Sequence, residues 1–289
     1  MTVLVIGATG NVGSRVVREL HERGAKVRAF VRDAERAPAG VELAIGDLSE
    51  TGSLRSALRG VERVFLACSN VPGQVEYECG AIDAAKTAGV ARIVKLSADV
   101  AAVDSPLLFP RRHGHIERHL RRSGVPSTVI APAFFMTNVL AFAEPIRHTG
   151  KLFAPAGGAR IAMIHPGDVA AAAAVALVED GHEGRRYHLT GPHAITYADV
   201  ARELSEATGR AIEFVDIPDE AARAGMLDAG LPPVVAEFLV TLYGALRDGV
   251  GEPTTDAVER LTGAAPRPFA EFAREHAALF QPVESGAPV

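Results

Sequence analysis

The stretch Val3-Leu4-Val5-Ile6-Gly7-Ala8-Thr9-Gly10-Asn11-Val12-Gly13 decides the fold of this chain. An apolar strand runs into a loop of spaced glycines, and the residues that follow carry the apolar stripe of a helix. Gly7 lets the chain turn tightly off the strand, Gly10 lets backbone N–H groups approach a pyrophosphate, and Gly13 lets the helix pack against the strand. Because a strand precedes the glycines and the positive end of a helix dipole follows them, the stretch predicts a dinucleotide-binding pocket.

The first half of the chain alternates apolar, β-rich runs with helical patterns, which is typical of βαβ units wound into a parallel sheet. A helix is expected over residues 74–87, because Val75, Ile82 and Ala85 share one face and Gly89 stops it. The fold class is therefore α/β, a doubly wound parallel Rossmann sheet with a smaller, mostly helical carboxy-terminal lobe. The predicted strands are residues 2–6, 26–31, 41–45, 62–67, 91–97 and 126–131.

The regular alternation ends near residue 133, where aromatic and proline residues appear together. We therefore expect an NAD(P)-binding core over residues 1–132, with one strand returning near 185–190, and a substrate-cleft lobe over 133–289 that is largely folded onto the core. Thr196 and Asp199 predict a capped helix within this lobe. Only the end of the chain, residues 284–289, is expected to be loose.

The chain has 289 residues and a formal charge of -5, with no basic block. This charge argues against nucleic acid or an anionic membrane as a partner. Two cysteines, Cys68 and Cys79, are too few for a disulfide framework. Only Met1 and Thr2 precede the first strand and no apolar run reaches spanning length, so we expect a cytoplasmic protein with a small-molecule partner. A homodimer and a regulatory protein partner both remain open.

The second predicted strand ends in Val31-Arg32-Asp33, where a dinucleotide fold distinguishes NAD from NADP. A carboxylate there binds the ribose hydroxyls of NAD, whereas a guanidinium clamps the additional phosphate of NADP. Arg32 comes first and Asp33 is placed to cap a short helix, so we expect NADP(H) to be preferred over NAD(H). The alternative is that Arg32 is an ordinary solvated arginine. Asp47 could reach the adenine ring or cap a helix.

Seven segments together resemble the NmrA-like branch of the atypical short-chain dehydrogenase/reductases: Gly7 to Gly13, Val31 to Asp33, Gly46 to Leu48, Ile93 to Ser97, Phe135 to Asn138, Leu189 to Pro192, and Leu261 to Gly263. The resemblance covers nearly the whole chain. It implies a Rossmann domain that holds NADP(H), a smaller lobe that closes over a cleft, and reduction of quinones or triphenylmethane dyes. Some members of this branch resemble cofactor sensors without turnover.

The resemblance also carries site residues over by position. Ser97 would lie where the larger superfamily keeps its catalytic serine. The expected cofactor-binding residues are Gly7, Thr9, Gly10, Asn11, Val12, Gly13, Arg32, Asp47, Leu48, Ala67, Cys68, Ser69 and Lys95.

The proton-delivering pair of ordinary short-chain reductases, a tyrosine with a lysine four residues on, is missing. Tyr243 with Arg247 is the nearest approach to it. Reduction of a simple ketone is therefore disfavoured, because a bare alkoxide is a high-energy product. A quinone, an enone or an iminium-like dye spreads the incoming charge over its own π-system and needs mainly positioning. The candidate substrate contacts, which could equally be packing residues, are Phe134, Phe135, Met136, Asn138, Phe142 and Phe153.

The segment from His113 to His119 stands where the family pattern would put that pair. We expect no metal there, because His115 and His119 could share a helix face but no second ligand cluster is evident. His113 or His115 could supply a proton, since imidazole titrates near neutrality, and the alternative is a solvated, arginine-rich helix. Ser97 could orient a carbonyl but has no evident activating base. Cys68 is expected to be a buried apolar residue near the adenosine.

The leading hypothesis is an NADPH-dependent oxidoreductase that transfers hydride directly to a conjugated or aromatic acceptor, without flavin or metal. The alternative is a regulatory protein that senses NADP(H) without turnover. An epimerase or dehydratase of the wider superfamily is a weaker hypothesis, because the tyrosine and lysine pair is absent.

Overall fold

The computed structural model describes residues 1–282 and divides into two compact units. The first unit contains Met1–Pro132, Pro166–Leu189 and Asp256–Ala265. The second contains Ala133–His165, Thr190–Thr255 and the chain from Pro266 onward. Residues 284–289, which the sequence suggests are loose, lie outside the described part of the chain.

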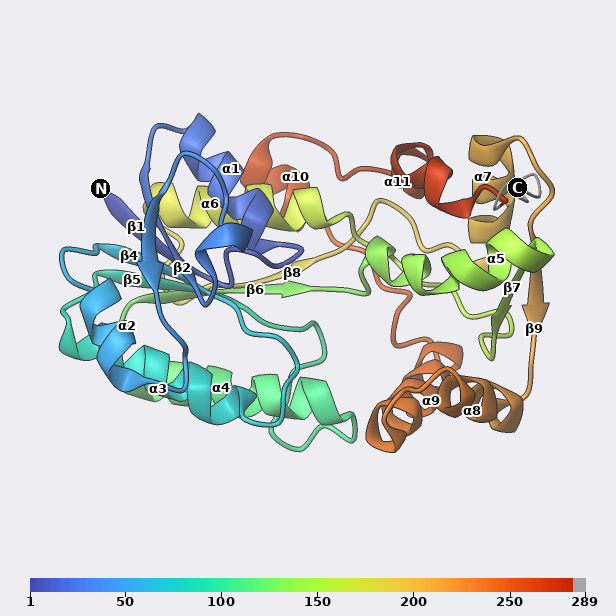
Figure 1. Cartoon of the computed structure of the whole chain (residues 1–289), viewed down its shortest axis with the longest axis horizontal. Coiled ribbons are helices and arrows are strands. Elements are labelled where there is room, and N and C mark those ends of the chain that lie inside the picture. The colour runs from blue at the N-terminus through green and yellow to red at the C-terminus, as the bar shows by residue number, and fades with distance from the viewer. Residues whose placement is uncertain (283–289) are drawn as a thin grey trace, which may run out of the picture. The chain divides into compact units, whose positions relative to one another are not determined.

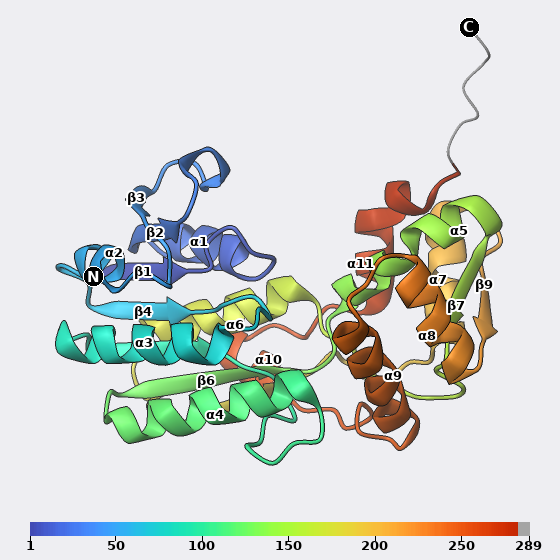
Figure 2. The same cartoon turned by 60° about the horizontal axis from the view of Figure 1, so that its bottom comes forward.

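The first unit is built on one parallel sheet. Its elements are β1 (Thr2–Ile6), α1 (Gly13–Glu22), β2 (Lys26–Val31), η1 (Ala34–Arg36), β3 (Glu42–Ile45), α2 (Thr51–Ala57), β4 (Arg63–Leu66), α3 (Gln74–Thr87), β5 (Arg92–Leu96), α4 (Leu108–Ser123), β6 (Ser127–Pro132), α6 (Pro166–Val178), β8 (Arg186–Leu189) and α10 (Ala257–Thr262). The strand order is β3-β2-β1-β4-β5-β6-β8, and every pair is parallel. α1 and α6 cover one face of the sheet, and α2, α3 and α4 cover the other (Figures 1 and 2).

The predicted doubly wound α/β fold is confirmed. All six predicted strands and the returning strand are present, each to within one residue at either end, and the helix over 74–87 has the predicted bounds. The apolar runs are continuous because both faces of the sheet are covered. The stripe of α1 faces inward, with Val16, Val17 and Leu20 buried. The strand order reverses between β1 and β4, and sheets of this kind bind ligands at their carboxyl edge beside such a reversal.

The division of the chain differs from the expected continuous second domain over 133–289. Besides the returning strand, α6 and α10 belong to the first unit. α6 is apolar nearly all round, and it packs against β4, β5 and β6 of the sheet and against the helices α1 and α10. A helix that is apolar all round needs partners on several sides, and the sheet and these two helices supply them.

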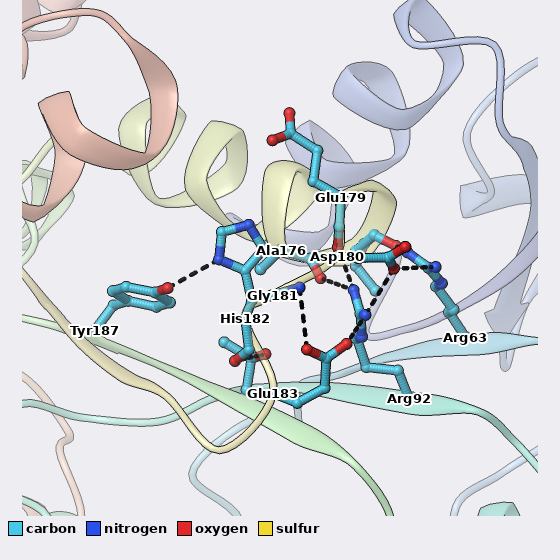
Figure 3. A network of polar contacts seen from close by, with 11 residues as sticks. Arg63, Arg92, Ala176, Glu179, Asp180, Gly181, His182, Glu183 and Tyr187 are labelled. Atoms are coloured by element: carbon cyan, nitrogen blue, oxygen red, sulfur yellow. Dashed lines mark hydrogen bonds and ion pairs between the residues drawn. The ribbon is translucent and has the colours of Figure 1, made fainter.

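Two arginines from the sheet close the carboxyl end of α6 (Figure 3). The helix has no basic residue in its own last turn. Arg63 Nη1 donates to the carbonyl of Leu177 at 2.5 Å, and Arg92 donates to the carbonyls of Ala176 at 3.1 Å and of Glu179. These carbonyls are among those that a helix cannot pair internally. Arg63 of β4 and Arg92 of β5 therefore cap the carboxyl end of α6.

Carboxylates hold both arginines in place. Asp180 Oδ1 lies 3.0 Å from Arg63 Nη2 and 3.0 Å from Arg92 Nη2, and Glu183 also pairs with Arg92. A hydrogen bond from Arg92 and the charge of Arg63 hold the pKa of the Asp180 carboxyl below its usual value. Arg92 is nearly buried, with 5% of its side chain exposed, whereas Asp180 is 83% exposed. The most buried charged group of this network is thus the guanidinium of Arg92.

The second unit has its own core. Its elements are η2 (Met136–Phe142), α5 (Ala143–Thr149), β7 (Lys151–Ala154), α7 (Tyr197–Thr208), β9 (Glu213–Asp216), α8 (Asp219–Asp228), α9 (Pro233–Arg247), α11 (Phe269–His276) and η3 (Ala277–Phe280). The core forms around Tyr197, Phe272 and Phe280, which are fully buried. Thr196 and Asp199 form the predicted capping box of α7. β7 and β9 pair as a small parallel sheet, which the sequence did not predict. Within residues 1–282, no helix combines the length and the apolar character that crossing a bilayer requires.

Replacing Arg92 by methionine should lower the free energy of unfolding by about 2–3 kcal/mol, because buried carbonyls at the end of α6 lose their donor. Urea denaturation of both proteins measures this difference. Arg23→Met is the matched control, since Arg23 makes an exposed pair with Glu19 at 3.6 Å and its loss should cost less than about 1 kcal/mol. Equal midpoints for the two variants would contradict a capping role for Arg92.

Candidate functional site

The backbone packs so tightly around Gly7 and Gly13 that a side chain at either position would clash with a carbonyl oxygen. A Cβ atom on Gly13 would lie 2.1 Å from the carbonyl oxygen of Gly7. Gly7 has φ +81°, and a Cβ atom there would lie 2.7 Å from the carbonyl oxygen of Ala67, just after β4. At Gly10 the corresponding distance to the carbonyl oxygen of Gly7 is 3.2 Å. The loop therefore lies directly against the ends of β1 and β4, beside the reversal of strand order.

The amino terminus of α1 is arranged to receive an anion. No side chain caps this helix end, and its first turn holds no acidic residue. The positive end of the dipole is therefore not neutralised by the helix itself. Thr9, Gly10 and Asn11 are exposed in front of it. Arg15 Nη1 donates to the backbone oxygen of Asn11 at 2.6 Å and to its side-chain oxygen at 2.8 Å, which fixes the loop. These features fit the phosphates of a dinucleotide.

Arg32 lies exposed at the end of β2, and its charge acts on Asp47, another predicted site residue. Asp33 caps η1 by accepting from the backbone N–H of Glu35 at 2.9 Å, as the sequence suggests. Asp47 accepts from the backbone and hydroxyl of Ser49 at 2.8 and 2.7 Å. These hydrogen bonds, and then the charge of Arg32, lower the pKa of Asp47. Asp47 thus closes its own turn and does not cap α2, whose N-cap is Glu50 without a side-chain hydrogen bond, and its contact with the adenine ring stays a prediction.

The segment after β4 carries Ala67, Cys68 and Ser69. Ala67 and Cys68 are half-buried and Ser69 is exposed, and Leu48 from the turn after β3 packs on the core of the first unit. Burial, together with the charge of Glu78, raises the pKa of the Cys68 thiol to about 11. The thiol is therefore protonated at neutral pH and is a poor nucleophile.

Lys95 was expected among the cofactor-binding residues, but its side chain is fully buried. Its Nζ lies 2.8 Å from Glu78 Oε2 and 3.3 Å from His113 Nδ1, and it donates to the carbonyl of Leu96. Gln74 Nε2 donates to Glu78 Oε1 at 3.1 Å. Burial raises the pKa of Glu78, and the adjacent ammonium opposes that shift. Because the ammonium is fully buried among these interior groups, Lys95 does not present it to a ligand.

The histidines of α4 do not act together. His113 is buried, and burial followed by the charge of Lys95 holds its pKa well below the usual value. His113 is therefore neutral at physiological pH, and the expectation that it supplies a proton is wrong for this geometry. His115 Nδ1 lies 2.9 Å from Arg118 Nη2, whereas His119 Nε2 lies 2.8 Å from Asp83 Oδ1. Within residues 1–282, no three histidine, cysteine or acidic side chains cluster at metal-binding distance.

Ser97 has a partner that the sequence did not reveal. Its hydroxyl donates to Glu117 Oε1 at 2.5 Å, and Arg186 Nε lies 3.3 Å from Glu117 Oε2. Glu117 is buried in α4, twenty residues along the chain from Ser97. Because the Ser97 hydrogen is already donated, the hydroxyl offers acceptor lone pairs and no donor to an incoming carbonyl. The expected carbonyl-orienting role of Ser97 therefore does not follow from this geometry.

Asp99 and His188 form a second pair that was missed. His188 Nε2 lies 2.8 Å from Asp99 Oδ1, and 26% and 23% of the two side chains are exposed. Asp99 follows β5, and His188 lies in β8. Arg186 and His188 alternate along the predicted returning strand, which places both on one face. That alternation is the only local signal that could have drawn attention to them.

The aromatic candidates lie in the second unit. Met136 is 1% exposed and belongs to the core of that unit, so it is a packing residue. Phe142 meets Tyr197 edge to face, with ring centroids 5.8 Å apart. Phe134, Phe135 and Phe153 are half-buried, and Asn138 is exposed. These last four residues keep surface that a ligand could contact, and their role as substrate contacts stays a prediction.

Comparison with known proteins now places the chain. A model of the NmrA-like family matches residues 1–266. The chain belongs to the NmrA-like family. The resemblance drawn from its motifs is thereby confirmed.

Two curated relatives and one solved structure match almost end to end. The NAD(P)H azoreductase of Xenophilus azovorans is 40% identical over 282 residues, which cover 96% of this chain and 99% of that protein. The (4-alkanoyl-5-oxo-2,5-dihydrofuran-3-yl)methyl phosphate reductase of Streptomyces griseus is 40% identical over 286 residues, covering 97% and 99%. The NADPH-dependent quinone oxidoreductase QOR2 of Escherichia coli, solved with NADPH, has a TM-score of 0.87 at 30% identity, covering 95% and 99%.

Replacing Gly13 by alanine should weaken NADPH binding by at least about tenfold. The added methyl group would clash with the carbonyl oxygen of Gly7, and the end of the helix must shift to relieve the clash. Overpacking of this kind typically costs ~1–3 kcal/mol. Fluorescence titration with NADPH measures the affinity. Gly80→Ala in α3 is the matched control, since a Cβ atom there meets nothing within 4 Å. Its affinity should equal that of the wild type. Wild-type affinity in Gly13→Ala would show that the loop is not the phosphate cradle.

Proposed function

We propose that this chain is an NAD(P)H-dependent oxidoreductase that transfers hydride directly to a conjugated or aromatic acceptor. The observation that carries the proposal is the tight glycine loop at the uncapped end of α1, in a chain of the NmrA-like family. Three closely matching proteins support it by their names, which describe an azoreductase, a reductase of an oxo-dihydrofuran and a quinone oxidoreductase. When bound, a reduced nicotinamide cofactor supplies the hydride.

The side chains at the carboxyl edge favour a particular class of acceptor. A simple ketone needs an acid within hydrogen-bond reach at the moment of hydride transfer. Neither of the two groups that the sequence suggested for this task supplies it, because Ser97 donates its hydrogen to Glu117 and burial holds the pKa of His113 well below its usual value. Quinones, enones, azo compounds and cationic dyes instead spread the added charge over a π-system, so positioning contributes most of the catalysis. Phe134, Phe135 and Phe153 are the proposed contacts for such flat acceptors.

We also propose that NADPH is preferred over NADH. Arg32 is the exposed cation at the end of β2, and Asp33 is turned toward η1 as its cap. Beside the loop lies a pocket of about 430 Å³, whose lining includes Thr9, Arg18 and Arg36. Arginines around this position favour the additional phosphate of NADPH, because a guanidinium makes paired, charged hydrogen bonds with it.

The reductase proposal is tested by turnover. Purified protein is mixed with NADPH and a panel containing a benzoquinone, an azo dye, a conjugated enone and a triarylmethane dye, and cofactor oxidation is followed by absorbance. Sustained consumption with at least one of these acceptors is expected. Tight binding of NADPH without consumption by any of them would support a sensor of the cofactor instead.

Replacing Arg32 by alanine should weaken NADPH binding by about 10- to 100-fold, the equivalent of ~1.5–3 kcal/mol for a lost charged hydrogen bond, while NADH binding changes little. Isothermal calorimetry with both cofactors measures the two affinities. Arg55→Ala, at an exposed arginine of α2, is the control and should leave both unchanged. Equal losses for NADPH and NADH in Arg32→Ala would remove the assignment of Arg32 to the phosphate.

A further inference from the structure

The Asp99–His188 pair combines contact with a carboxylate and partial exposure, and Asp99 follows the carboxyl end of β5. The imidazole is in contact with a carboxylate at 2.8 Å, and about a quarter of each side chain is open to solvent. An imidazole held in this way can give up a proton and regain one from water. His113 is buried and its pKa is held well below the usual value, and Lys95 is fully buried against Glu78.

The position of Asp99 is fixed by Arg186. Arg186 Nη2 donates to the carbonyl oxygens of Ala98 at 2.7 Å and of Asp99 at 2.5 Å. The Asp99 backbone N–H donates to the carbonyl oxygen of Pro132 at 3.1 Å. Arg186 itself lies 3.3 Å from Glu117 Oε2. The segment that carries Asp99 is therefore held between β6 and β8, and its carboxylate is held toward His188.

The pair also lies on the expected side of the sheet. A dinucleotide crosses the carboxyl edge at the reversal of strand order, with one half on each side. Arg32 marks the β2 and β3 side as the adenosine side. The reactive half of the cofactor then belongs over β4, β5 and β6. Asp99 follows β5, and His188 lies in β8, which pairs with β6.

We propose that His188 is the acid that protonates the acceptor, with Asp99 and Arg186 as positioning residues; this inference rests on the reductase function proposed above. With a quinone, hydride adds to the conjugated ring system and the imidazolium gives its proton to an oxygen. With an azo compound, hydride adds to one nitrogen and the proton goes to the other. The imidazole then recovers a proton from water, so each turnover consumes one hydride and one proton. A cationic triarylmethane dye becomes neutral on accepting hydride alone and needs no proton.

This difference between acceptors provides the test. His188→Gln should lower kcat for an azo dye by about 10- to 100-fold, at the low end of what proton delivery contributes. The quinone should lose less, because its reduced anion is a weaker base. The rate with a cationic triarylmethane dye should stay at the wild-type value. Added imidazole should restore part of the azo activity of His188→Ala.

His119→Gln is the matched control, because His119 also contacts a carboxylate, Asp83, at 2.8 Å on the same unit. It should leave all the rates unchanged. Equal losses for the azo dye and the cationic dye in His188→Gln would overturn the proposal and indicate a structural role. An unchanged azo rate in His188→Gln would also overturn it. A wild type inactive with every acceptor would contradict the reductase function itself.

A second measurement needs neither cofactor nor turnover. NMR of the cofactor-free protein labelled with ¹⁵N-histidine measures the ring nitrogen shifts of His188, and Asp99→Asn should change those shifts because the carboxylate lies 2.8 Å from Nε2. His188 shifts that are identical in wild type and Asp99→Asn would show that the carboxylate does not hold the imidazole, and would overturn the positioning role of Asp99.

Discussion

The contact between Gly13 and the carbonyl oxygen of Gly7 is the constraint on which the rest of the structure depends. A Cβ atom at Gly13 would lie 2.1 Å from that oxygen, so the first turn of α1 sits as close to the end of β1 as a backbone allows. This closeness places the buried stripe of α1 on the sheet and, with the same geometry, aims the positive end of the helix at the carboxyl edge. Glycine at position 13 is therefore required both for the packing of α1 on the sheet and for the position of the anion site.

The parts of the fold that sequence predicts well are those with a local cause. β1, β4, β5 and β6 in the middle of the large sheet are mostly buried apolar runs, and α1, α3 and α4 are followed by glycines with positive φ. α6 shows the limit of this reasoning, because an all-round apolar pattern indicates burial without saying against what. β7 and β9 show a second limit of sequence reasoning. Each strand is only four residues long, which is too short for an alternating pattern to identify it, and the two strands pair across some sixty residues of sequence.

The residues of the candidate site likewise fall into those that the sequence predicts and those that it does not. Gly7, Gly13 and the Asp33 cap have roles set by neighbours in sequence, and these are predictable. Lys95 is paired with Glu78 from α3, and the pKa of His113 is shifted by burial and by the charge of Lys95, so an expected ligand and an expected acid become interior groups. A pKa depends on burial and on charges brought close by folding, and residue type alone indicates neither.

Two arginines on strands of the sheet, Arg92 on β5 and Arg186 on β8, donate hydrogen bonds to backbone carbonyls, with different results. Arg92 donates to carbonyls at the end of α6, where helix geometry has already fixed the backbone, so its bonds add stability without choosing a shape. Arg186 donates to the carbonyls of Ala98 and Asp99, in a segment without regular structure, so its bonds select one conformation among several. A planar guanidinium with several fixed donors can hold two carbonyls and a carboxylate together, which a single ammonium does less well. The position of Asp99, in the irregular segment after β5, is therefore set by Arg186 from the neighbouring strand β8.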